Sequence, residues 1–122
     1  MKRIVVLTSI LFCLALLAPA AQADTHVCFD WSCNSTTKQC TFDASCSSAS
    51  PFIWKYDFDW GDGTSTGLTG NPNQTHSYPS TPYPVVELTV YPWGDDVQSH
   101  SCQITVYNVF SPPLPTSGRC EE

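Results

Sequence analysis

The sequence predicts an all-β protein, a disulfide-stabilised immunoglobulin-like β-sandwich of about seven strands. Two observations carry this prediction. Apolar and polar residues alternate with a period of two along several segments, which is the pattern of a strand with one buried face. Turn-forming glycine, proline and asparagine separate these segments at short intervals, and no helical period appears after the first 23 residues.

The segment that organises the chain is an aromatic strand that ends in a glycine-rich turn. Tyr56, Phe58 and Trp60 alternate, so they leave the same face of an extended chain. Gly61-Asp62-Gly63 follows at once and supplies residues that tolerate the positive φ angles of a tight turn. A strand with such an aromatic face needs a second sheet to bury it, which favours a sandwich.

The same segment resembles the signature of PKD (polycystic kidney disease) domains, and the resemblance spans roughly residues 27–108. Phe58-Asp59-Trp60-Gly61-Asp62-Gly63 is similar to the W-D-F-G-D-G strand and turn, with the two aromatics exchanged. His76-Ser77-Tyr78 and Val86-Glu87-Leu88-Thr89-Val90 resemble the later H-x-Y and Y-x-V-x-L-x-V blocks. The resemblance implies an immunoglobulin-like sandwich and a structural hydrogen bond at His76.

The second block departs from the family pattern at its entry. Pro82 and Pro84 flank Tyr83, and counting back from Val90 in steps of two reaches Pro84. We therefore expect a bulge or a shifted strand entry there.

The first 23 residues have the features of a secretory signal peptide. A basic Lys2-Arg3 precedes an apolar run over residues 4–18, and Ala21-Gln22-Ala23 is a small-x-small cleavage site. We expect cleavage before Asp24, a sandwich domain over residues 24–110 and a proline-rich tail over residues 111–122 that Cys120 tethers. The expected location is extracellular or periplasmic, with no membrane span after cleavage.

Charge excludes two classes of partner. Without Lys2 and Arg3, three of the five basic residues remain against eleven acidic ones, a net charge of −8. Such a chain is a poor ligand for nucleic acid and for anionic membrane surfaces.

Six cysteines remain after the expected cleavage, an even number that predicts disulfides in an exported chain. With a turn centred near Thr36-Thr37, Cys33 and Cys40 face each other across a hairpin, so we predict this bridge. Inward parity favours Cys46–Cys102 between the sheets, as in immunoglobulin-like sandwiches. Cys28 has outward parity, and we predict Cys28–Cys120; Cys28–Cys46 is the rival pairing.

The strands are expected over residues 27–33, 40–46, 52–60, 85–91 and 101–109. Residues 64–75 are expected to form a loop with one short edge strand, and residues 92–96 form a hairpin tip.

Three carboxylates, Asp57, Asp59 and Asp62, lie within six positions. A calcium site is one interpretation, since calcium prefers several oxygen ligands. The favoured interpretation is structural, because aspartate commonly accepts backbone N–H bonds in turns. No cofactor is therefore predicted, and the calcium site is retained as the lesser hypothesis.

The predicted function is non-catalytic recognition of an extracellular protein or polysaccharide through exposed aromatics. Trp93 lies at the expected hairpin tip, Tyr91 precedes it, and Trp54 lies near the start of the organising strand. Aromatic side chains at such positions stack on sugar rings and anchor protein interfaces. No nucleophile has a base beside it in the sequence, so we do not predict an enzyme. The alternative is a structural or assembly partner of another exported protein.

Overall fold

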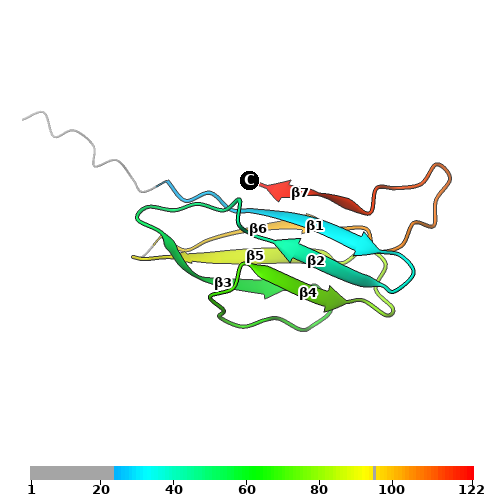
Figure 1. Cartoon of the computed structure of the whole chain (residues 1–122), viewed down its shortest axis with the longest axis horizontal. Helices are drawn as coiled ribbons and strands as arrows, with labels where there is room; N and C mark the ends of the chain where they lie inside the picture. The colour runs from blue at the N-terminus through cyan, green and yellow to red at the C-terminus, as the bar shows by residue number, and fades with distance from the viewer. Residues whose placement is uncertain (1–23, 95) are drawn as a thin grey trace, which may run out of the picture.

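The computed structural model describes residues 24–94 and 96–122, so the predicted signal peptide lies outside the described residues. The described chain forms two antiparallel sheets packed face to face (Figure 1), which confirms the predicted β-sandwich. One sheet has the order β4-β2-β1-β7 and the other β3-β5-β6. The bounds are β1 Cys28–Asn34, β2 Gln39–Asp43, β3 Ile53–Asp59, β4 Asn73–Ser77, β5 Val85–Pro92, β6 Gln98–Gln103 and β7 Ser117–Glu121.

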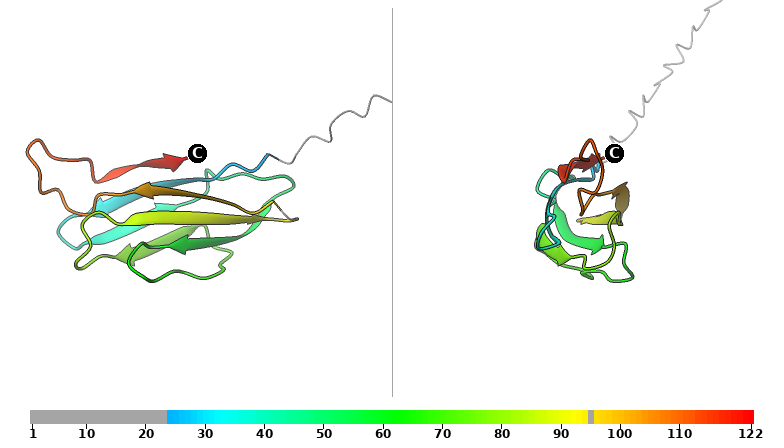
Figure 2. Two further views of the ribbon diagram at one scale, coloured as in Figure 1. Left: turned by 180° about the vertical axis from the view of Figure 1, so that it is seen from behind. Right: turned by 90° about the vertical axis from the view of Figure 1, so that its right-hand side faces the viewer.

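The core lies between the two layers, which separate clearly in the end-on view of Figure 2. Four aromatic rings fill its centre, and neighbouring ring centroids lie 4.8–6.1 Å apart. They come from both sheets: Phe29 and Phe42 from β1 and β2, and Phe58 and Trp60 from β3 and its end. Phe58 and Trp60 are therefore buried as the alternation predicts, because Phe29 and Phe42 of the other sheet pack against them, whereas Tyr56 is half-buried.

The β1–β2 hairpin forms with the register that the sequence predicts. Asn34 Oδ1 accepts hydrogen bonds from the backbone N–H groups of Thr36 and Thr37, which closes the turn. Cys33 then lies directly opposite Cys40, and the two form a disulfide with a Cα–Cα distance of 4.0 Å. The predicted Cys33–Cys40 bridge is confirmed.

The other two predicted bridges, Cys46–Cys102 and Cys28–Cys120, are wrong. The structure pairs Cys28 with Cys46, the rival pairing, and Cys102 with Cys120. The prediction that Cys46 points inward is wrong because β2 already ends at Asp43. The chain then turns at once, with Ser47 N–H donating to Ala44 O at 2.9 Å.

Cys28 does lie on the outer face of β1, but the segment after β2 folds over it and leaves it only 1% exposed. Ser47 Oγ accepts from Cys28 N–H at 2.9 Å and donates to Cys28 O at 2.6 Å. This contact places Cys46 within reach of Cys28.

A bridge between the sheets exists, with Cys120 in the place expected for Cys46. Cys120 lies opposite Phe29 in the β1–β7 register, and Cys102 lies opposite Val86 in the β5–β6 register. Because Phe29 and Val86 both face the core, both sulfur atoms point between the layers.

The segment expected as a tail contains the last strand. Residues 117–121 form β7, which pairs with β1, so the sandwich domain continues past residue 110. The signal is weak in the sequence because Ser117, Gly118 and Arg119 have little β-propensity. Gly118 lies against the ring of Trp31, and a Cβ atom there would lie 3.2 Å from the ring, so a larger residue would require Trp31 to shift.

The strand expected over residues 101–109 is shifted to Gln98–Gln103. The chain stays extended beyond it, with Ile104 N–H donating to Pro84 O and Val106 N–H to Pro82 O. The two prolines lack an N–H group, so they return no hydrogen bond and the regular ladder ends. β5 accordingly begins at Val85, which agrees with the expected irregular entry.

Within the described ranges, no helix has the length and apolar character needed to cross a bilayer.

Candidate functional site

Three large aromatic side chains lie exposed together at the end of the sandwich that holds the start of β3 and the end of β5. They are Phe52, Trp54 and Trp93, with exposed fractions of 51%, 43% and 62%. We call this cluster the aromatic surface. The ring centroids of Phe52 and Trp93 lie 5.9 Å apart, and those of Trp54 and Trp93 lie 6.3 Å apart.

Backbone pairing between β3 and β5 brings the three rings together. Trp93 N–H donates to Phe52 O at 2.9 Å, one step beyond the last paired residues, Ile53 and Pro92. The register shifts between Ile53 and Lys55, so Ile53 takes the inward position opposite Pro92. Trp54 is the extra residue of this β-bulge, and its side chain is left outside the core.

The rings form a corner and not a flat platform. Phe52 and Trp93 are close to parallel, with 20° between their planes, whereas Trp54 stands at 83° to Trp93. The ammonium of Lys55 lies 5.7 Å from the centroid of the Trp54 ring, a cation–π contact. The corner exposes ring faces and ring edges at the surface.

Two of the three predicted binding residues, Trp54 and Trp93, therefore meet in the structure. Tyr91 lies opposite Lys55 in the strand register and is half-buried. Phe52, which makes the stacking contact with Trp93, is not predicted by the sequence pattern. Its position is set by pairing between strands far apart in the sequence, and no local pattern contains that information.

The three predicted metal-ligand carboxylates serve separate contacts. Asp59 Oδ1 accepts from Gly61 N–H at 3.0 Å, and Asp62 Oδ1 accepts from Thr64 N–H at 3.0 Å. Asp57 lies opposite Thr89 on the outer face, and its Oδ1 atom is buried without a hydrogen-bond partner. The contacts of Asp59 and Asp62 are the turn-stabilising ones that the structural interpretation predicts.

In the described part of the chain, two groups of three potential ligand side chains lie close enough to share an ion. They are His100 with Cys102 and Cys120, and His26 with Cys28 and Glu121. All their cysteines are in disulfides and offer no thiolate. Neither group includes Asp57, Asp59 or Asp62, so the calcium site stays a prediction.

His76 joins the glycine-rich turn to β4. Its ring stacks on Trp60 with 4.8 Å between centroids, and its Nε2 atom lies 2.7 Å from Asp62 Oδ2. Tyr78 Oη donates to Trp60 O at 2.9 Å. Burial raises the pKa of Tyr78, and the nearby carboxylates of Asp62 and Asp59 raise it further, so this hydroxyl stays protonated as a donor.

The pKa of Asp62 is lowered from its ordinary value of 3.8. Burial acts in the opposite direction and raises it, but hydrogen bonds from Thr64 and His76 to the carboxylate outweigh burial. The folded state therefore favours the charged form of Asp62. Its contribution to stability is present above pH 3.8 and is lost as the pH falls through the lower folded-state pKa.

We predict that Asp62→Asn removes this acid-sensitive part of the stability. Denaturant unfolding of the wild type and the variant, followed from pH 6 to below pH 3.8, should give free energies that differ at the upper end and converge at the lower end. Glu87→Gln removes an exposed carboxylate on β5 and is the control. Its free energy of unfolding should fall between pH 6 and pH 3.8 by as much as that of the wild type. A constant gap between wild type and Asp62→Asn at every pH would contradict the prediction.

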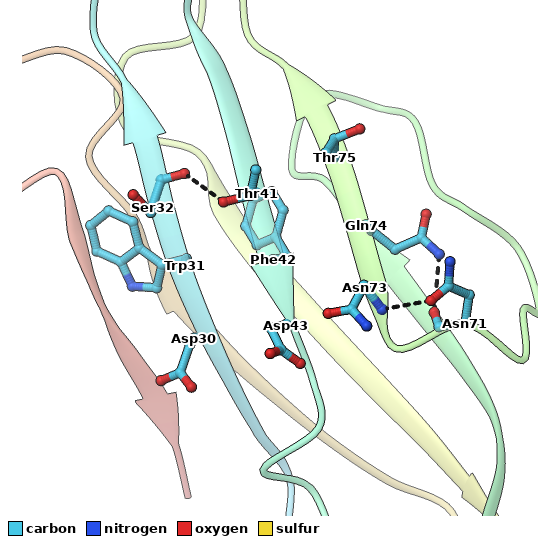
Figure 3. Close-up of a pocket in the computed structure, with 10 residues that line it drawn as sticks. All are labelled: Asp30, Trp31, Ser32, Thr41, Phe42, Asp43, Asn71, Asn73, Gln74 and Thr75. Atoms are coloured by element: carbon cyan, nitrogen blue, oxygen red, sulfur yellow. Dashed lines mark hydrogen bonds between the residues drawn. The ribbon is translucent and has the colours of Figure 1, made fainter.

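A shallow groove of about 590 Å³ lies over β2 on the outer face of the four-stranded sheet (Figure 3). Its floor follows the strand register, with Asp30, Asp43 and Asn73 in one row and Ser32, Thr41 and Thr75 in the next. Asp30 forms a two-point ion pair with Arg119, at 2.7 and 3.1 Å, and the hydrogen bond from Arg119 lowers the pKa of Asp30. The groove thus offers hydroxyl, amide and carboxylate groups on an open surface.

Comparison of the chain with protein-family models, with curated proteins and with solved structures gives no match.

Proposed function

We propose that this protein is a non-catalytic recognition module that works outside the cytoplasm and binds an extracellular polysaccharide or protein through the aromatic surface. One observation carries the proposal: Trp93 packs against both Phe52 and Trp54 while each of the three remains more than two-fifths exposed. Scattered exposed apolar residues are ordinary, but a cluster of large aromatic rings is typical of a contact site. Tryptophan is also among the residues that contribute most to binding.

Two further features support a role outside the cytoplasm. Three disulfides join the six cysteines that follow the expected cleavage site, and such bridges persist in oxidising compartments. The signal-peptide pattern of residues 1–23 agrees with export. We include in the proposal that the domain is PKD-like, on the strength of the two sequence blocks and the all-β sandwich.

We include in the proposal that the module is non-catalytic, because aromatic rings hold a ligand by stacking and packing and do not attack bonds. The aromatic surface combines three rings with the Lys55 ammonium. The carboxylates of the glycine-rich turn are held in hydrogen bonds with the backbone, which suits them to support the turn.

We predict that Trp93→Ala weakens binding on the order of 30-fold, the effect of losing about 2 kcal/mol at a hot spot. The measurement is retention of the oxidised protein on insoluble chitin, cellulose and collagen, with wild type and variant side by side. Leu68→Ala shortens another exposed apolar side chain, and the polymers should retain this variant as they retain the wild type. Equal retention of the Trp93 variant on every polymer that binds the wild type would exclude the aromatic surface as the site.

A second candidate function is assembly with another exported protein. The observation that favours it is a second exposed apolar segment between β6 and β7, with Val109, Phe110 and Leu114 at the surface. Such a partner would remain bound when Trp93 is replaced, and co-purification of the wild type and the Trp93 variant from the native host tests this.

A further inference from the structure

The chain between β6 and β7 presents a proline-rich loop at one end of the sandwich. Residues 108–115 are all exposed and include Val109, Phe110 and Leu114. Pro112, Pro113 and Pro115 lie in the same eight residues. Figures 1 and 2 show this segment projecting from the end of the long axis that is opposite to the β5–β6 connection. We call it the proline-rich loop.

The loop is fixed at both of its ends. Before it, Tyr107 Oη donates to Tyr78 O at 3.0 Å and to Pro79 O at 2.9 Å. After it, Cys33 N–H donates to Thr116 O at 2.7 Å, and the Cys102–Cys120 bridge holds the following strand. Because both ends are anchored, the domain carries the loop outward and the loop has little freedom to fold back.

The composition of the loop suits it to an aromatic partner surface. Proline restricts the backbone and removes its N–H donor, so less entropy is lost when such a segment is bound. Proline-rich segments dock in grooves lined by aromatic rings, where the apolar pyrrolidine rings pack against ring faces. The corner formed by Phe52, Trp54 and Trp93 offers ring faces of this kind.

The loop and the aromatic surface lie at opposite ends of the same molecule, as the strand directions in Figure 1 show. β3 starts and β5 ends beside the aromatic surface, whereas β6 ends and β7 starts beside the proline-rich loop. A molecule therefore cannot bring its own loop to its own aromatic surface. The same contact between two molecules is head-to-tail, and the resulting pair keeps one free aromatic surface and one free proline-rich loop, to which further molecules can add.

We propose that the aromatic surface binds the proline-rich loop of a second copy of this chain, so that the protein forms open head-to-tail assemblies. The inference rests on the proposed function of the aromatic surface as a contact site, and it names the partner. Binding is non-covalent and buries apolar atoms of Leu114 and the prolines against the three rings.

Sedimentation velocity of the oxidised, secreted protein tests the proposal, from micromolar to near-millimolar concentration. We expect the mean sedimentation coefficient of the wild type to rise with concentration through a series of species. Trp93→Ala and the loop variant Pro113→Ala/Leu114→Ala should each weaken the self-association about tenfold or more. Leu68→Ala should associate as the wild type does, and melting temperatures of all variants verify that they fold.

A mixing experiment separates head-to-tail association from a symmetric contact. The Trp93 variant keeps an intact loop, and the loop variant keeps an intact aromatic surface, so an equimolar mixture has one complete pair of surfaces. At a concentration at which neither variant associates with itself, we expect the mixture to form a heterodimer and to stop there. A symmetric contact between two aromatic surfaces would give no heterodimer and would overturn the proposal.

Two other results would also overturn it: a wild type that stays monomeric at every concentration, or association that survives both variants. Neither result bears on polymer binding, because retention on chitin, cellulose and collagen is measured separately. If retention depends on Trp93 but the protein stays monomeric, the recognition function stands and the second copy is not the partner. If the protein associates as expected and no polymer retains it, the aromatic surface serves assembly alone.

Discussion

Gly61→Ala should destabilise the folded protein by about 4 kcal/mol, a large effect for the addition of one methyl group. Gly61 has a φ of 76°, a region that alanine enters only with strain. A Cβ atom there would lie 2.3 Å from Val85 O and 2.9 Å from Val85 N. These atoms belong to the start of β5, so relief of the clash requires the two strands to separate.

Gly63→Ala is the matched control, because it shares the strain and lacks the clash. Its φ is 88°, and a Cβ atom would meet no atom within 4 Å. We expect a loss of about 1 kcal/mol from the positive φ alone. Urea unfolding of the oxidised protein gives both free energies, and equal losses at the two positions would show that the contact with Val85 is unimportant.

Replacement of both Cys102 and Cys120 by serine should cost about 3 kcal/mol, the chain-entropy value for a bridge across 18 residues. The same change at Cys33 and Cys40 removes a bridge across 7 residues and should cost nearer 2 kcal/mol. The first pair also joins the two sheets and holds β7 beside β1. We therefore expect a local effect in addition to the global one.

Amide hydrogen exchange distinguishes the local effect from the global one. Loss of Cys102–Cys120 should lower the protection of β7 and of its partner strand β1 well below that of β5. Loss of Cys33–Cys40 should lower the amide protection of the strands without an additional decrease in β7. If β7 remained as protected as β5 in the Cys102/Cys120 variant, its pairing with β1 would be sufficient to hold it.

Local patterns were enough to predict the parts of the fold that depend on neighbouring residues. The β1–β2 hairpin is an example, since a short turn at Asn34–Lys38 fixes the register that places Cys33 opposite Cys40. The burial of Phe58 and Trp60 is another, because alternation alone assigns a strand its inner face.

Features that depend on pairing between distant segments were missed or misassigned. Cys120 reaches the core only because β7 pairs with β1, about ninety positions earlier in the chain. The alternation of inward and outward side chains does not extend to Cys46, because β2 ends at Asp43.

The candidate site shows the same limit. Trp93 and Trp54 were predicted as exposed aromatics from their positions near strand ends, and both are exposed. Phe52 escaped prediction because its contact with Trp93 follows from the β3–β5 register, which includes a bulge. A single extra residue in a strand reverses every assignment of faces on one side of it, and no feature of residues 52–55 marks that residue in advance.

The bulge at Trp54 also separates the composition of the aromatic surface from the requirements of folding. Ile53 fills the inward position opposite Pro92, so the identity of residue 54 is not constrained by the volume of the core. Substitutions there alter the contact surface while the packed interior keeps its composition. Under the proposed recognition function, the contact surface can accordingly diversify at one position at little cost to stability.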